Sequence, residues 1–97
     1  MIKHIVMVKF KPEVSQEQQA EFAKKVPEVL AKIPGAKNIT LGLALAVESE
    51  PRYDGATFMD FDDEAQLKAY LDHPMHQAVD AQARAMCSDY LIMNFLY

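Results

Sequence analysis

Three side chains in this 97-residue sequence are well suited to acid–base chemistry: His4, Tyr70 and His76. An imidazole can accept a proton near neutral pH, so a histidine is the commonest general base. A tyrosine hydroxyl can donate a hydrogen bond to an oxygen that gains negative charge. If these three residues converge, they could remove a proton alpha to a carbonyl group without a cofactor.

The segment around His76 also indicates how that side chain is positioned. Pro74 suits the first position of a helix, so we expect a helix to begin there and to place His76 in its first turn. The positive end of the helix opposes a second positive charge, which favours a neutral imidazole. His73 precedes the proline, where helical angles are disfavoured, so we expect it to cap the helix or mark the junction.

Residue patterns predict the elements that must hold these side chains. Alternating apolar residues predict strands over 2–10, 38–47, 55–61 and 89–97. Ser15 and Gln18 form a capping-box pattern, so a first helix should begin there and end at Pro34-Gly35. A second helical region should be capped by Asp62 and interrupted at His73-Pro74, and 48–51 should form a loop.

The order strand-helix-strand-strand-helix-strand predicts an α+β, ferredoxin-like fold in one domain over residues 1–97. Its sheet would have four antiparallel strands, with the helices on one face. We assign His4 to that face, and Tyr70 and His76 to the inward side of the helices. The lining of the resulting pocket would come from Val6, Val8, Phe22, Val26 and Val79, with His73 nearby.

Each candidate also has a structural interpretation. An inward-facing histidine often only hydrogen-bonds to the backbone, and a buried tyrosine often keeps its hydroxyl at the edge of the core. His73 and His76 could share a metal ion with Asp72 or Asp80, but the proline disrupts their helical spacing, so we expect no metal. No nicotinamide, flavin or nucleotide motif is present, so we expect no cofactor.

Two groups of charged residues have structural interpretations. Four acidic residues resemble a magnesium cluster but are better explained as charges at the start of a helix: Asp60, Asp62, Asp63 and Glu64. Asp80 and Arg84 are four residues apart, so we expect them to form a surface pair on a helix.

Composition limits the class of protein. Hydrophobic residues make up 51% and charged residues 25%, which is typical of a globular domain. The net charge of −4 leaves no basic face for a nucleic-acid partner. The single cysteine, Cys87, excludes a disulfide framework. No signal peptide or membrane-spanning segment is apparent, so we expect a cytoplasmic protein without a membrane partner.

The helices can cover only one face of the predicted sheet. The second strand carries large aliphatic residues, and the last strand is apolar on both faces. An apolar face left in water would form a large exposed patch. We therefore expect a homodimer in which two sheets pack face to face.

Three segments resemble one known family. They are the opening Lys3-His4-Ile5-Val6, the helix stop Ile33-Pro34-Gly35, and Phe61-Asp62 followed by the run from Tyr70 to His76. Together they are similar to the stress-responsive dimeric α/β-barrel (Dabb) family, along essentially the whole chain. The Tyr-x-x-His-Pro-x-His segment is the most specific of them.

The resemblance implies a ferredoxin-like fold that dimerises through its sheets. The family includes plant stress proteins and polyketide cyclases of the olivetolic acid cyclase type. In the cyclases a helix histidine acts as base, assisted by a tyrosine and a first-strand histidine, and these roles would fall on His76, Tyr70 and His4. Asn94 stands where the family often has an aspartate.

Two functions are therefore open. The chain could be a cofactor-independent cyclase or isomerase that acts on a small, partly apolar oxygenated molecule such as a polyketide. Alternatively, it could be a stress-responsive or ligand-binding dimer without catalysis, in which the histidines are structural. A cofactor-free monooxygenase shares the related fold but lacks the His-Pro-x-His segment.

Overall fold

The computed structural model describes residues 1–45 and 52–97. Its strands are β1 (Ile2–Phe10), β2 (Lys37–Leu43), β3 (Gly55–Phe61) and β4 (Cys87–Leu96). Its helices are α1 (Gln16–Leu30), α2 (Glu64–Asp72) and α3 (Pro74–Met86). This is the predicted ferredoxin-like order, with the second helical region divided in two.

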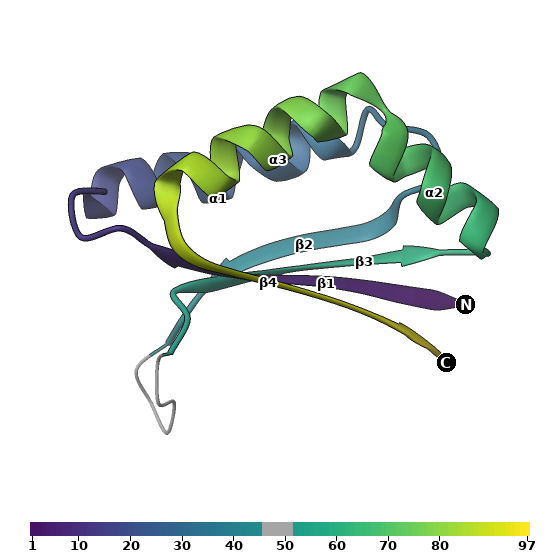
Figure 1. Ribbon diagram of the computed structural model, residues 1–97, viewed down its shortest axis with the longest axis horizontal. Coiled ribbons are helices and arrows are strands. Elements are labelled where there is room, and N and C mark those ends of the chain that lie inside the picture. The colour runs from purple at the N-terminus through teal and green to yellow at the C-terminus, as the bar shows by residue number, and fades with distance from the viewer. Residues whose placement is uncertain (46–51) are drawn as a thin grey trace.

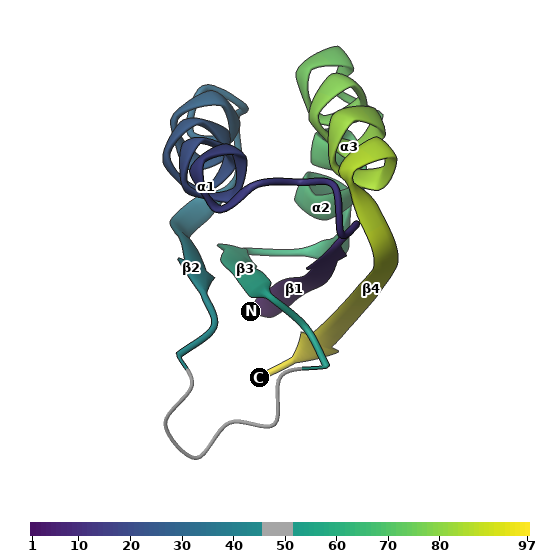
Figure 2. The same cartoon turned by 90° about the vertical axis from the view of Figure 1, so that its left-hand side faces the viewer.

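The four strands form one antiparallel sheet in the order β2-β3-β1-β4. All three helices lie on the same side of this sheet, and no helix or strand of the described residues covers the opposite side (Figure 1). The end-on view shows α1 and α3 side by side above the sheet, with α1 nearer β2 and α3 nearer β4 (Figure 2). The predicted layer arrangement is therefore confirmed.

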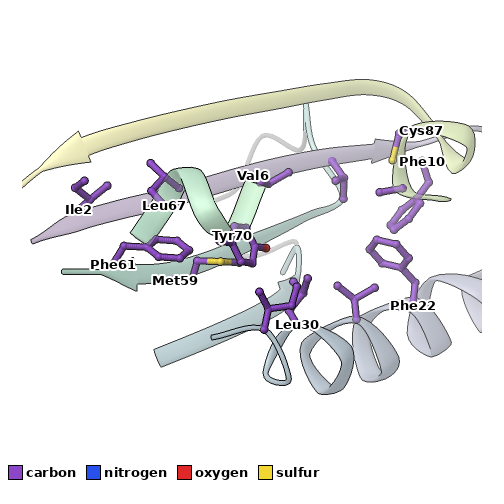
Figure 3. Packing of buried hydrophobic residues seen from close by; sticks show 14 residues of the cluster. Ile2, Val6, Phe10, Phe22, Leu30, Met59, Phe61, Leu67, Tyr70 and Cys87 are labelled. Carbon is purple, nitrogen blue, oxygen red and sulfur yellow. The ribbon is translucent and has the colours of Figure 1, made fainter. Parts of the chain in front are cut away.

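The core lies between the sheet and the helices, because alternate residues of β1 turn toward the helices and are buried. Tyr70, Phe61, Met59 and His4 are the largest fully buried side chains. Figure 3 shows Tyr70 from α2 between Met59 and Leu30, and Phe10 facing Phe22. One polar side chain of this group, His4, is thus embedded in the apolar layer.

The strands differ from the prediction at two ends. β2 was expected to continue beyond Leu43, but its pairing stops where Leu43 meets Gly55, the first residue of β3. Val47 and the predicted loop 48–51 lie outside the described residues. β4 begins at Cys87 and not at Asp89, because Cys87 already pairs with Phe10 across a register shift.

The helix boundaries follow their caps. Ser15 and Gln18 form the predicted capping box. The Ser15 hydroxyl oxygen accepts from the Gln18 amide at 3.1 Å, and the Gln18 side-chain oxygen accepts from the Ser15 amide at 2.9 Å. The predicted Asp62 cap is wrong: Asp63 accepts the hydrogen bond from the Gln66 amide, at 2.8 Å. Asp62 lies one residue too early for this bond.

Other differences concern the first helix and the membrane prediction. α1 ends at Leu30, four residues before Pro34, and Gly35 then adopts a positive φ of 95° that suits glycine. Pro27 lies within α1, which continues to Leu30. None of the helices in residues 1–45 and 52–97 has the length and apolar character needed to span a membrane.

Asp60 was predicted to be one of a group of helix-start charges, and the structure corrects this. It lies on β3, is only 4% exposed, and faces the uncovered side of the sheet opposite Lys3. Its oxygens accept hydrogen bonds from Lys3 (2.7 Å), Tyr97 (2.6 Å) and Asn38 (3.0 Å). These donors hold the pKa of the Asp60 carboxyl well below its usual range.

Candidate functional site

Three elements bring the predicted polar side chains together between the sheet and the helices. β1 supplies His4, and the junction of α2 and α3 supplies Tyr70 and His76. The ring centres of Tyr70 and His76 are 4.6 Å apart, and those of His4 and Tyr70 are 6.0 Å apart. All three side chains line one cavity.

The break between α2 and α3 fixes the position of His76. His73 ends α2 in an extended conformation, and its Nδ1 accepts the Met75 amide hydrogen at 3.1 Å, which caps α3 as expected. His76 Nδ1 lies 3.1 Å from the Leu71 carbonyl oxygen. A carbonyl oxygen can only accept, so Nδ1 carries the proton and Nε2 of a neutral ring keeps its lone pair.

Tyr70 is 1% exposed and packs between Phe61 and His76. The Tyr70 side chain lines the cavity, and its hydroxyl forms no hydrogen bond with protein groups in residues 1–45 and 52–97. No fully enclosed side-chain oxygen or nitrogen in these residues lacks a partner, so this hydroxyl is open to the cavity. Burial raises the pKa of Tyr70 above its ordinary value, and the nearby Tyr90 and Asp80 raise it further. The hydroxyl is therefore neutral at physiological pH and can donate a hydrogen bond.

His4 is 1% exposed and hydrogen-bonded through Nδ1 to the side-chain oxygen of Asn94, across the β1–β4 pairing. Burial lowers the pKa of His4, which the Asn94 bond opposes and the charge of His76 reinforces. Because Asn94 Oδ1 is an acceptor, the His4 Nδ1 carries the proton and its Nε2 is the free acceptor. Asn94 is a neutral partner in the place where an aspartate would favour an imidazolium.

All five apolar residues that were predicted to line the pocket do line this cavity: Val6, Val8, Phe22, Val26 and Val79. His73 is not among its lining residues, because its ring turns to the α3 cap. Sequence reasoning missed six other members, which are Leu30, Thr57, Met59, Asp80, Ala83 and Tyr90. Thr57 and Met59 could have been found from the alternation of β3, since they face the same side as Phe61.

Asp80 and Tyr90 are the polar groups that the sequence did not place in the cavity. Asp80 was predicted to form an exposed pair with Arg84, and Arg84 Nε does donate to one carboxylate oxygen at 3.0 Å. Its other oxygen accepts from the Tyr90 hydroxyl at 3.1 Å, on the cavity side. Burial raises the pKa of Tyr90, and the Asp80 charge raises it further.

The cavity that contains the three polar side chains is small. Its volume is about 30 Å³, room for about two water molecules. A larger groove of about 410 Å³ lies outside it, lined by residues of α1 and α3. Phe22, Val26 and Val79 belong to both linings, so they form the wall between groove and cavity. A ligand larger than water would reach His76 by displacing this wall.

The cavity chemistry rests on nitrogen and oxygen groups of the chain itself. Within 1–45 and 52–97, no three His, Cys, Asp or Glu side chains gather as a set that could hold a metal ion. Cys87 is buried, and burial raises the pKa of its thiol, which disfavours a nucleophilic thiolate. The cavity offers imidazole nitrogens that can accept a proton and a neutral hydroxyl that can donate one, within a largely apolar lining.

Fold and site together define a ferredoxin-like α+β protein with a histidine–tyrosine pocket between its sheet and helices. The family model of the stress responsive A/B barrel domain (Dabb) matches residues 2–96, so the chain belongs to that family. The resemblance noted in the sequence is thereby confirmed.

Similar proteins include enzymes and a protein of unknown function. Olivetolic acid cyclase of Cannabis sativa is 25% identical over 95 residues, which cover 97% of this chain and 94% of that protein. A dimeric ferredoxin-like protein of unknown function from Thermobifida fusca is 30% identical, with a TM-score of 0.88, over 99% of this chain and 90% of that one. Hydroxynitrile lyase from Passiflora edulis shares the fold, with a TM-score of 0.87 and 20% identity, over 99% and 92% of the two chains.

Proposed function

We propose that this protein binds a small, partly apolar carbonyl compound between its sheet and helices and catalyses proton abstraction next to the carbonyl group. One observation carries the proposal. The Leu71 carbonyl oxygen accepts the Nδ1 proton of His76, so Nε2 of the neutral ring is a free base, and the Tyr70 ring lies 4.6 Å away in the lining of the same cavity.

In the proposed reaction, His76 Nε2 takes the proton from the carbon alpha to the carbonyl. The bonding pair of that C–H bond forms a carbon–carbon double bond, and the carbonyl oxygen becomes an oxyanion. Tyr70 donates a hydrogen bond to this oxygen. In a substrate with a second carbonyl, the enolate carbon attacks it, a carbon–carbon bond closes a ring, and His76 returns the proton to the new alkoxide.

The geometry favours a role for His4 other than that of a second donor. Its Nδ1 proton is held by Asn94, and burial opposes the imidazolium, so the free Nε2 accepts a hydrogen bond. We propose that His4 orients a ligand hydroxyl or an enol. The olivetolic acid cyclase relative supports a cyclisation of a polyketide-like substrate as one form of this chemistry.

The test uses 4-methylacetophenone in heavy water. Proton NMR follows the exchange of its acetyl methyl protons, which lie alpha to the carbonyl group, for deuterium. The wild-type protein should accelerate this exchange. His76→Gln should reduce the rate at least about a hundredfold, and Tyr70→Phe should reduce it by a similar factor. His73→Asn is the matched control, because it removes an imidazole outside the cavity and keeps a good helix cap.

A wild-type rate equal to that of the buffer, with binding still detectable, would overturn catalysis and favour a ligand-binding role. Loss of exchange in His76→Gln counts only if thermal unfolding shows that the variant is folded. If His76→Gln fails to fold, Tyr70→Phe decides the question, since it keeps the ring that packs against Phe61 and removes only the hydroxyl.

We also propose that the protein is a homodimer joined through the uncovered face of the sheet. Register places six apolar residues on this face: Ile5, Met7, Phe58, Leu91, Met93 and Phe95. The aliphatic residues Ile39 and Leu41 of β2, by contrast, pack against the core under the helices. The Thermobifida fusca relative is described as dimeric, which supports the same assembly here.

A further inference from the structure

We propose that Asp80 and Tyr90 form a specificity element that selects ligands with a hydrogen-bond donor, such as a hydroxyl group, and rejects carboxylates. This inference rests on the proposed ligand site and names the class of compound that the site takes. Asp80 and Tyr90 also line the cavity, and the proposed reaction gives neither of them a role.

The hydrogen bonds decide what this end of the cavity can offer a ligand. The single hydroxyl proton of Tyr90 is donated to Asp80 Oδ1 at 3.1 Å, so the Tyr90 oxygen is left as an acceptor. An ionised Asp80 carboxylate also only accepts. Both groups can therefore receive a hydrogen bond from a ligand, and neither can donate one.

Arg84 holds this arrangement in place without reaching the ligand. Its Nε donates to Asp80 Oδ2 at 3.0 Å, and its guanidinium carbon lies 4.5 Å from the centre of the Tyr90 ring. The Arg84 side chain is 54% exposed and is not part of the cavity lining. The cation thus holds Asp80 from the exposed side, while the Asp80 and Tyr90 side chains both line the cavity.

The spacing relates this element to the proposed base. Asp80 follows His76 by four residues on α3, which is one helical turn and about 6 Å along the axis. Tyr90 of β4 pairs with Val8 of β1. Val8 follows His4 by four residues, which is about 13 Å along the strand. An aromatic ketone is larger than the cavity of about 30 Å³, so it would enter by displacing the wall of Phe22, Val26 and Val79. With its carbonyl group at His76 and Tyr70, a group about one aromatic ring away would then lie beside Asp80 and Tyr90.

Charge acts in the same direction as the hydrogen bonds. A ligand carboxylate at this position would face the Asp80 carboxylate, whose side chain is only 26% exposed, and the two like charges would repel each other. A hydroxyl group would instead donate to the Tyr90 oxygen or to Asp80. A methyl group would leave these acceptors without a new partner and should bind with intermediate strength.

The test measures binding of three acetophenones that differ only at the position para to the acetyl group. They are 4-hydroxymethylacetophenone, 4-methylacetophenone and 4-acetylbenzoate, titrated into the full-length protein and followed by protein chemical shifts in NMR. We expect the hydroxymethyl compound to bind about fivefold to tenfold more tightly than the methyl compound, as one added hydrogen bond allows. We expect the carboxylate to bind most weakly.

Two variants and a control assign the preference. Tyr90→Phe should remove most of the advantage of the hydroxymethyl compound, and Asp80→Asn should reduce the penalty against the carboxylate. Glu21→Gln makes the same charge change as Asp80→Asn, but in the outer groove, and should leave the order of affinities unchanged. Thermal unfolding checks that each variant is folded.

The outcomes separate this inference from the proposed function. Equal binding of all three ketones by the wild type would overturn the specificity element and leave the site standing. A preference that survives both Tyr90→Phe and Asp80→Asn would also overturn it. Binding of none of the three would overturn the proposed ligand site, and this inference with it. Absence of deuterium exchange with the binding order intact would overturn only the catalysis.

Discussion

His4 and His76 are held in the same tautomer by different acceptors. Asn94 receives the Nδ1 proton of His4, and the Leu71 carbonyl receives that of His76. Both rings in their neutral form therefore present Nε2 lone pairs, and Tyr70 supplies the hydroxyl proton. The cavity combines two bases with one donor, which suits removal of a proton more than stabilisation of a preformed anion.

The buried His4 predicts how stability depends on pH. Its pKa in the folded protein is below the ordinary 6.5, so the unfolded chain takes up a proton more readily. As pH falls below 6.5, His4 should therefore reduce the free energy of unfolding, and this loss is complete below its folded pKa. Denaturant titrations at a series of pH values should show it.

Asn94→Asp should change this pH dependence in a known direction. A carboxylate beside Nδ1 favours the imidazolium, so it should raise the pKa of His4 and shrink or reverse the acid destabilisation. Gln82→Glu, with the same charge change on α3, is the control. An unchanged His4 titration in Asn94→Asp, followed by NMR, would contradict the contact between the two side chains.

At the scale of elements, the junction of α2 and α3 depends on one cap. His73 Nδ1 accepts the Met75 amide hydrogen, in the place of the usual serine or aspartate. His73→Ala should lower the free energy of unfolding by about 1 kcal/mol, and His73→Asn should lower it by clearly less. Urea denaturation of the three proteins measures this, and equal losses in both variants would argue against capping.

Local signals in the sequence predicted most element boundaries. The alternation of β1, the Ser15–Gln18 capping box and the His73-Pro74 break depend on neighbouring residues, and the structure confirms all three. The end of β2 and the start of β4 were missed, because each depends on where a partner strand begins or ends. Neither partner is visible from local periodicity.

The difference between local signals and distant partners also explains which site residues the sequence could predict. His4, Tyr70 and His76 could be grouped because each lies on the inward face of a recognisable element. The Asp80–Tyr90 contact was missed because it joins α3 to β4, and the spacing of Asp80 to Arg84 suggested only a surface pair. Asp60 was misassigned for a similar reason, since its partners come from three separate segments.

At the scale of the whole molecule, the sheet divides the protein into two unlike sides. The helix side encloses the cavity, while the opposite side exposes Phe58 (41%), Met93 (55%) and Leu91 (40%). β1 contributes to both, with His4 on one side and Ile5 on the other. A dimer through the uncovered side would bury the apolar patch and stiffen the strand that carries His4, without blocking the groove between α1 and α3.

Met93→Glu tests this assembly. In a two-fold symmetric interface the substitution places two new carboxylates on one apolar contact, so dimerisation should weaken at least about a hundredfold. Sedimentation velocity at micromolar concentration should show a dimer of 11.0 kDa chains for the wild type and a monomer for Met93→Glu. The monomer should stay folded, because Met93 lies outside the core between sheet and helices.

Ala81→Glu on the exposed side of α3 is the control for this experiment and should remain dimeric. If Ala81→Glu dissociates and Met93→Glu does not, the helices form the interface. A monomeric wild type would mean that the apolar side of the sheet has no second copy of this chain as its partner.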